Sequence, residues 1–227
     1  MKKFASLLVF ALLMLPTTFY AQKISNIDFD SIKAKIQDEN SSSYYPNLIE
    51  RLKLHDPTLT EDDYTNLYYG NVFYENYDPY AFNKEKSDNE KELNKQMKAG
   101  NFKEAIPLAL AILDKNPIEL EPLTFLMIAY GNLKDKESVR KFIPAYAELI
   151  KAIERSGDGK SKETAYVISS VPDEYQLLYF KKLTPISQKL IDARYDVLEV
   201  KDENGNVENV YFDVSKPLKK SREYYSK

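Results

Sequence analysis

Apolar residues recur every three to four positions in the first third of the chain, which is the spacing of amphipathic helices. The pattern predicts a short helix within residues 26–40 and a second helix within residues 44–57. Pro57 ends the second helix, because the residue before a proline is pushed out of the helical backbone region. A third helix is predicted to follow Thr60, whose side chain can form a capping box with Asp63.

The strongest helical pattern lies in the middle of the chain, in residues 100–117 and 118–142. Between residues 86 and 155 the sequence resembles about one and a half tetratricopeptide repeats, which are stacked helical hairpins. Pro144 departs from the repeat and is expected to kink or split the helix that contains it. The resemblance assigns the turn, packing and core positions of the repeat to Gly100, Phe102, Ala105, Leu123, Leu126, Ala129 and Tyr130.

The last third of the chain changes to strand-like patterns. Residues 165–169 favour a strand, and Pro172 is expected in the first turn of a helix. Two further strands are predicted at residues 195–200 and 209–214, with an Asn-Gly turn between them that is typical of a hairpin. These elements predict an α+β fold, mainly helical, in which tetratricopeptide-like hairpins are capped by a small C-terminal sheet with one helix.

The predicted elements divide the chain into five segments. Because the repeat-like helices are too few to bury a continuous core alone, we expect residues 22–216 to form one compact body. The segments are a signal peptide (1–21), a Tyr-rich helical segment (22–85), tetratricopeptide-like helices (86–156), a strand-helix-hairpin unit (157–216) and a basic, solvated tail (217–227).

The first 21 residues have the pattern of a secretory signal peptide. Lys2 and Lys3 precede an apolar run from Phe4 to Leu15, and Ala21 precedes the polar remainder. This run of twelve residues is too short to span a bilayer, which takes about 20 in a helix. The chain has no cysteine, so neither a lipid-modified cysteine nor a disulfide is expected. We therefore expect an exported protein, periplasmic or secreted, with no lipid anchor and no integral membrane segment after cleavage.

The charge and the residue counts argue against several functions. The net charge is -3, and binding to nucleic acid needs clustered basic residues, so no nucleic-acid partner is expected. The chain has one histidine, His55, which makes a histidine-based metal site impossible. No phosphate loop is present either: Glu154 stands where the motif ending in Gly159 needs its first glycine. We expect no cofactor, and we expect the glycines near Asp158 to end a helix.

Two groups of residues remain as candidate ligand contacts. Asp158, Asp173 and Glu174 carry carboxylates that suit acid-base work, although acidic residues after a helix-starting proline are also expected from the helix dipole. Tyrosine is unusually frequent, with 18 in all. The tyrosines can form either an exposed face that binds a sugar or peptide, or the core of a helical layer. The candidate tyrosines are Tyr68, Tyr69 and Tyr175.

Several separate stretches together resemble one family of exported bacterial proteins that is known only as a domain of unknown function. The resemblance covers nearly the whole chain, in the same order, and implies a tetratricopeptide-like middle and an envelope or secreted location. It assigns no catalytic residues. The stretches that carry it are residues 59–70, 77–80, 156–168, 173–175 and 210–214.

Two functions follow from these observations as hypotheses. The first is a non-enzymatic module of the cell envelope that binds another envelope or secreted protein or peptide, since helical repeats usually recognise extended peptides. The second is an enzyme or a binder of a small ligand such as a glycan, with a carboxylate and tyrosine site at the junction of helices and sheet. A deep pocket that gathers the carboxylates favours the second hypothesis, and an open groove favours the first.

Overall fold

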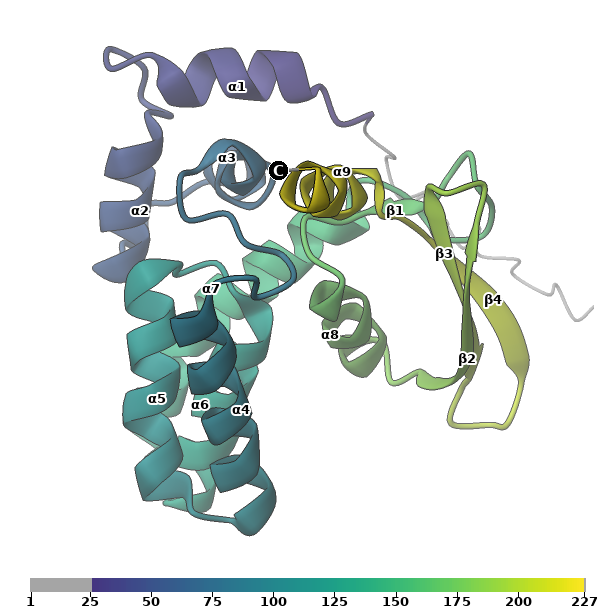
Figure 1. The fold of residues 1–227 in the computed structure, drawn as a ribbon. Helices are drawn as coiled ribbons and strands as arrows, with labels where there is room; N and C mark the ends of the chain where they lie inside the picture. Colours follow the sequence, from purple (N-terminus) through teal and green to yellow (C-terminus); the bar gives the residue numbers. More distant parts are fainter. Residues whose placement is uncertain (1–25, 227) are drawn as a thin grey trace, which may run out of the picture.

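The computed structural model describes residues 26–226, and the predicted signal peptide lies outside them. Figure 1 shows the helices α2 to α7 on one side and the strands on the other, with α8 between them. This arrangement confirms a mainly helical α+β fold. The helices are α1 (Phe29–Gln37), α2 (Tyr45–Lys53), α3 (Glu61–Gly70), the short 3-10 helix η1 (Asn71–Phe73), α4 (Lys84–Ala99), α5 (Phe102–Lys115), α6 (Leu120–Asn132), α7 (Lys136–Glu154), α8 (Pro172–Phe180) and α9 (Ser215–Tyr225).

The first three helices begin and end where their local sequence predicts. Asp28 caps α1, because its side chain accepts a hydrogen bond from the backbone N–H of Ser31. The predicted capping box of α3 is present, with Thr60 and Asp63 each accepting from the backbone N–H of the other. Among the tyrosines of this region, Tyr45, Tyr64, Tyr68, Tyr69 and Tyr77 are buried, so these five form core rather than an exposed aromatic face.

Consecutive helices from α4 to α7 pack against one another. Ala105 and Ala129 are buried, and the half-buried ring of Tyr130 stacks on Phe142 with 6.1 Å between centroids. Of the kink or split predicted at Pro144, the split is wrong, because α7 runs unbroken through it. Buried side chains directly after the proline hold this part of α7, and we attribute the continuity to that packing, which offsets the lost backbone hydrogen bond.

The strands β1 (Tyr166–Val167), β2 (Thr184–Ile191), β3 (Tyr195–Lys201) and β4 (Val207–Asp213) form one sheet in the order β1-β4-β3-β2. β1 is parallel to β4, and the other pairs are antiparallel. The predicted hairpin joins β3 to β4, and Gly205 adopts the positive φ of 88° that its turn requires. The sequence pattern did not predict β2, because seven of its eight residues are exposed and leave no apolar alternation.

The basic tail belongs to a helix, α9, whose start packs on the rest of the molecule and whose last residues, 222–225, are exposed. Pro217 is buried in α9, and Lys216 lies over the ring of Phe29 with 3.7 Å from its ammonium to the centroid. Near the end of α9, the ring of Tyr224 stacks on that of Phe82 with 4.0 Å between the ring centroids. One cluster of buried apolar residues extends from Ile32 to Val214. Among residues 26–226, no helix has both the length and the apolar character needed to cross a membrane.

Candidate ligand-binding cleft

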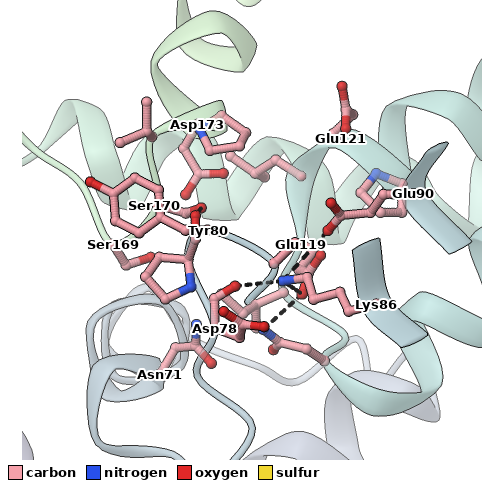
Figure 2. A pocket seen from close by; sticks show the side chains of 18 of the residues that line it. Asn71, Asp78, Tyr80, Lys86, Glu90, Glu119, Glu121, Ser169, Ser170 and Asp173 are labelled. Atoms are coloured by element: carbon pink, nitrogen blue, oxygen red, sulfur yellow. Dashed lines mark hydrogen bonds and ion pairs between the residues drawn. The ribbon is translucent and has the colours of Figure 1, made fainter. Parts of the chain in front are cut away.

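A cleft of about 320 Å³ lies where α8 meets the helical half of the molecule. Three stretches that are distant in sequence form its walls: residues 71–93, which include α4, residues 116–122, which include the start of α6, and residues 169–173. Figure 2 shows Asp173 reaching in from the α8 side, with Tyr80 beside it and Lys86 and Glu119 across from it. We call this hollow the acidic cleft, because Asp78, Glu90, Glu119, Glu121 and Asp173 line it.

Buried hydrogen bonds hold the walls of the acidic cleft together. The hydroxyl of Tyr77 donates to the carbonyl of Ser169 at 2.7 Å, which fixes the loop before α4 against the segment before α8. On the opposite side, the hydroxyl of Thr124 on α6 lies 2.7 Å from Oε1 of Gln176 on α8. The position of α8, and with it that of Asp173, is therefore set by contacts to both α6 and the loop.

Lys86 is the only basic side chain among the residues that line the acidic cleft. Its ammonium donates to the backbone carbonyl of Asp78 and to Oε1 of Glu119, each at 2.8 Å, and lies 3.6 Å from Oε1 of Glu90. Burial alone would lower the pKa of Lys86, but the charge and hydrogen bond of Glu119 raise it overall. Lys86 is therefore an ammonium whose donors are already engaged.

Asp173 is a buried carboxyl with one hydrogen-bond donor, the hydroxyl of Tyr68 at 2.7 Å. Burial raises the pKa of Asp173 to about 7, against the lowering effect of the Tyr68 hydrogen bond. The start of α8 would favour the ionised form by about 0.3–1 kcal/mol. The rise from 3.8 corresponds to about 4 kcal/mol in the opposite direction, so burial decides. The helix-dipole explanation for an acidic residue at this position is too weak.

Three other carboxyls of the cleft also hold their protons more tightly than usual. Burial raises the pKa of Glu90 to about 7, and Glu119 and Glu121 add to the effect by charge repulsion. Burial likewise raises the pKa of Glu119 and of Glu121. Near pH 7 Asp173 and Glu90 are therefore ionised only in part, and the cleft holds more acidic groups than its one ammonium can pair with.

Three side chains in the cleft walls are buried and have polar atoms without a partner. Among the described residues, no hydrogen bond reaches Oδ1 of Asn71, Oδ1 of Asn116 or the hydroxyl of Ser169. These residues are 3%, 5% and 1% exposed. Because leaving such a group unpaired costs about 1–3 kcal/mol, their gathering in one cleft points to a missing binding partner.

Glu174 follows Asp173 in sequence but points toward the sheet. Gln188 on β2 donates to Oε2 of Glu174 at 3.2 Å and to Asp196 at 2.7 Å, so one amide bridges two carboxyls. Burial, and then the neighbouring Asp196, raise the pKa of Glu174 to about 9. Tyr175 is partly exposed and donates to Gln188 at 2.6 Å. The structure therefore separates Asp173 from Glu174 and Tyr175.

Asp158 lies in a turn and is not among the residues that line the cleft. It accepts from the backbone N–H of Lys160 at 3.0 Å and from the hydroxyl of Thr164 at 2.6 Å, and these hydrogen bonds lower its pKa. Gly159 has a positive φ of 70°, as expected where the chain leaves α7. Tyr69 is buried behind this turn, and its hydroxyl lies 3.2 Å from the carbonyl of Ala152.

The candidate residues from the sequence thus reach three different places. Only Asp173 lines the cleft, and Tyr68 contacts it through a buried hydrogen bond. Lys86, Glu90, Glu119 and the unpartnered side chains were missed, because in sequence each stands beside a helix end or on a polar helix face and looks like an ordinary surface residue. In residues 26–226, no group of three or more His, Cys, Asp or Glu side chains is placed to hold a metal ion. The cleft can instead offer acceptor oxygens and negative charge to a ligand.

Comparison with known proteins gives a family and no function. A profile described as a domain of unknown function, DUF4919, matches residues 30–223. No curated protein and no solved structure matches the chain. Since the match covers most of the sequence, the chain belongs to the family described as Domain of unknown function (DUF4919).

Proposed function

We propose that this chain is a non-enzymatic binding protein that acts outside the cytoplasm and takes a protein or peptide partner in the acidic cleft. The proposed location comes from the predicted signal peptide, which the sequence of residues 1–21 supports. The proposed partner class comes from the stacked helices, which form one wall of the cleft and resemble peptide-binding repeats.

The observation that supports this site above others is the set of unpartnered polar atoms on Asn71, Asn116 and Ser169. A second hollow of about 240 Å³ lies between α2, α5, α6 and α7, with Leu123 and Phe142 in its walls. None of the four buried polar atoms that lack partners in the described residues belongs to this apolar hollow. A ligand in the acidic cleft therefore recovers hydrogen-bond energy that a ligand in the apolar hollow does not.

A second candidate function is an enzyme or small-ligand binder that uses the same carboxyls. It is favoured by the two groups with a pKa of about 7, Asp173 and Glu90, because a carboxyl that titrates near neutrality can both give and take a proton. Against catalysis, the only histidine, His55, lines the apolar hollow and not the cleft. Of the three candidate carboxylates from the sequence, only Asp173 lines the cleft, so the gathering that the second hypothesis predicts is incomplete. We therefore rank binding above catalysis.

Affinity capture with matched variants tests the proposed function. Glu121→Arg introduces a long cation in the first turn of α6, inside the cleft, and Glu137→Arg makes the same change in the first turn of α7, where the side chain is 87% exposed. Wild type and Glu137→Arg are expected to enrich the same protein or peptide from envelope extracts, and Glu121→Arg is expected to lose it. Equal enrichment by all three proteins would place the partner elsewhere.

Native mass spectrometry of the purified protein separates the two candidates. The proposed function predicts a bound polypeptide, or none after purification, whereas a retained small molecule that Glu121→Arg no longer holds favours the second candidate. Turnover of that molecule by the wild-type protein would make the chain an enzyme.

A further inference from the structure

The balance of charge in the acidic cleft indicates what kind of ligand it accepts. Five carboxyls and one ammonium line the cleft, and Lys86 already donates to two oxygens and lies close to a third. An anionic ligand would face this excess of negative charge at short range. Its repulsion is strong where water is excluded, because the effective dielectric constant there is far below that of water.

The unpartnered atoms favour the same kind of ligand as the charge does. Two of the three are amide oxygens, on Asn71 and Asn116, which only accept hydrogen bonds. The amide nitrogen of Asn116 is already committed, because it donates to Glu119 at 3.2 Å. The third atom, the hydroxyl of Ser169, can accept as well as donate. A ligand that satisfies these groups must therefore bring several hydrogen-bond donors.

Asp173 lies across the cleft from Lys86 (Figure 2), and no hydrogen bond in the described residues joins the two side chains. Its carboxyl has one donor, Tyr68, and no basic side chain within ion-pair distance in that part of the chain. A neutral donor would leave the ionised carboxylate without a counter-charge, which is costly at a site 5% exposed. A cation with several donors satisfies both requirements.

Resting on the proposed function, we infer that the cleft recognises a primary ammonium or guanidinium group, with Asp173 as its counter-ion. An ammonium has three donors and a guanidinium has five, and both form short charge-assisted hydrogen bonds to carboxylates. The group can belong to a lysine or arginine side chain of a peptide or to a free small amine, since both present the same chemistry to the cleft.

Binding of such a cation displaces a proton from Asp173. The neutral carboxyl gives its proton to solvent, and the carboxylate that remains pairs with the ligand, whose own charge does not change. The groups that face Asp173 or share the cleft with it are Tyr68 from α3, Tyr77, Asp78 and Tyr80 from the loop, Lys86 and Glu90 from α4, and Glu119 and Glu121 at the start of α6. Because Asp173 is mostly protonated below its pKa of about 7, release is greatest at mildly acidic pH.

Isothermal titration calorimetry with four probes tests this inference. The probes are cadaverine and three acetylated, amidated tripeptides, Ala-Lys-Ala, Ala-Arg-Ala and Ala-norleucine-Ala, the last being an uncharged match for lysine. The lysine or arginine peptide is expected to bind about tenfold or more tightly than the norleucine peptide. Titration in two buffers of different ionisation enthalpy is expected to show proton release near pH 6 and little near pH 8.5.

Variants of the cleft carboxyls check that the effect comes from this site. Asp173→Asn keeps an acceptor for Tyr68 but removes the charge, and it is expected to weaken binding of the cationic probe about tenfold near pH 8.5 and to abolish proton release near pH 6. Glu121 is half buried and makes no ion pair in the described residues. Glu121→Gln is therefore a second variant, and it is expected to weaken binding less than Asp173→Asn does. Glu137→Gln is the control and is expected to change nothing.

Equal affinity for lysine and norleucine peptides, or no binding of any cationic probe at 10 mM, would overturn the inference. The proposed function fails separately: if cadaverine binds as tightly as the peptides and no polypeptide is captured, cation recognition stands and the peptide partner does not. Conversely, if Glu121→Arg loses a captured partner that Asp173→Asn retains, the binding function is supported and recognition of a cation by Asp173 is refuted.

Discussion

Two aspartates of this protein look alike in sequence and occupy opposite environments. Asp158 lies between two glycines after α7, and Asp173 follows the proline that begins α8. Oδ1 of Asp158 accepts from both Lys160 and Thr164 within its own turn, so local chain geometry explains the residue. Asp173 has one donor, deep burial and a raised pKa, in a cleft whose walls hold unpartnered polar atoms.

The difference between the two aspartates shows what distinguishes a structural acidic residue from a candidate binding group. The turn of Asp158 uses its polar groups to fold the chain, and its ionised form is the stable one. The cleft of Asp173 retains polar groups that folding leaves unsatisfied, and natural proteins keep few of these without a reason. A motif-like sequence drew attention to the turn of Asp158, whereas only the arrangement in space identifies the cleft of Asp173.

The largest expected effect tests whether the Asp158 turn is structural. A Cβ atom on Gly157 would collide with the backbone carbonyl oxygens of Thr164 and Ala165, at 2.5 Å from the latter. Gly157→Ala is therefore expected to destabilise the protein by about 4–5 kcal/mol, since backbone atoms cannot easily move aside. Urea denaturation followed by circular dichroism measures the free energy of unfolding.

Gly131→Ala is the matched control for this change. Gly131 lies in α6, and a Cβ atom there meets nothing within 4 Å. This variant is expected to be stabilised by about 0.5–1 kcal/mol, because alanine loses less backbone entropy in a helix. If Gly157→Ala were as stable as Gly131→Ala, the close packing of the turn would be refuted.

The next effect concerns the pH dependence that burial gives to Asp173. Folding raises its pKa from 3.8 to about 7, so the stability that it contributes is fully present at acidic pH and is lost as the pH rises to about 7. Asp173→Asn carries no charge at any pH and escapes this loss. Relative to wild type, the variant is expected to gain up to about 4 kcal/mol between pH 4 and pH 7.5. Denaturation at a series of pH values measures the gain; a constant difference across this range would contradict the buried environment.

The smallest effect comes from Asp158, where the sign of the pKa change is reversed. Hydrogen bonds from Thr164 and Lys160 lower the pKa of Asp158, so its contribution is present above pH 3.8 and is lost only as the pH falls below it. Asp158→Asn is expected to cost about 1 kcal/mol through weaker hydrogen bonds, with no change between pH 4 and pH 7.5. It is also expected to leave binding of the lysine peptide unchanged. Weaker binding would show that Asp158 contributes to the binding site.

Local signals in the sequence predicted a large part of the fold. The capping box of Thr60 and Asp63, the helix that begins at Pro172 and the hairpin turn at Gly205 each depend on a few neighbouring residues, and each is present. The edge strand β2 left no such signal, because its exposed residues do not alternate. At Pro144 the local rule predicted a kink or a split, and the long helix is not split there.

The candidate site was much less predictable than the fold. Asp173 and Tyr68 were chosen as carboxylate and tyrosine, but nothing in the sequence pairs residues that stand 105 positions apart. Asn71 and Asn116 read as residues at helix ends, and their lack of hydrogen bonds arises only when distant segments meet. Burial, which sets the pKa of Asp173, is likewise a property of the assembled walls.

The most direct test of this account is one carbon-13 NMR titration that follows the carboxyl carbons of Asp173 and Asp158 in the same sample. The account predicts that Asp173 titrates near pH 7 and that Asp158 titrates below its ordinary value of 3.8. If both carboxyls titrate together near pH 4, Asp173 is an ordinary solvated residue and the acidic cleft is not the binding site described above.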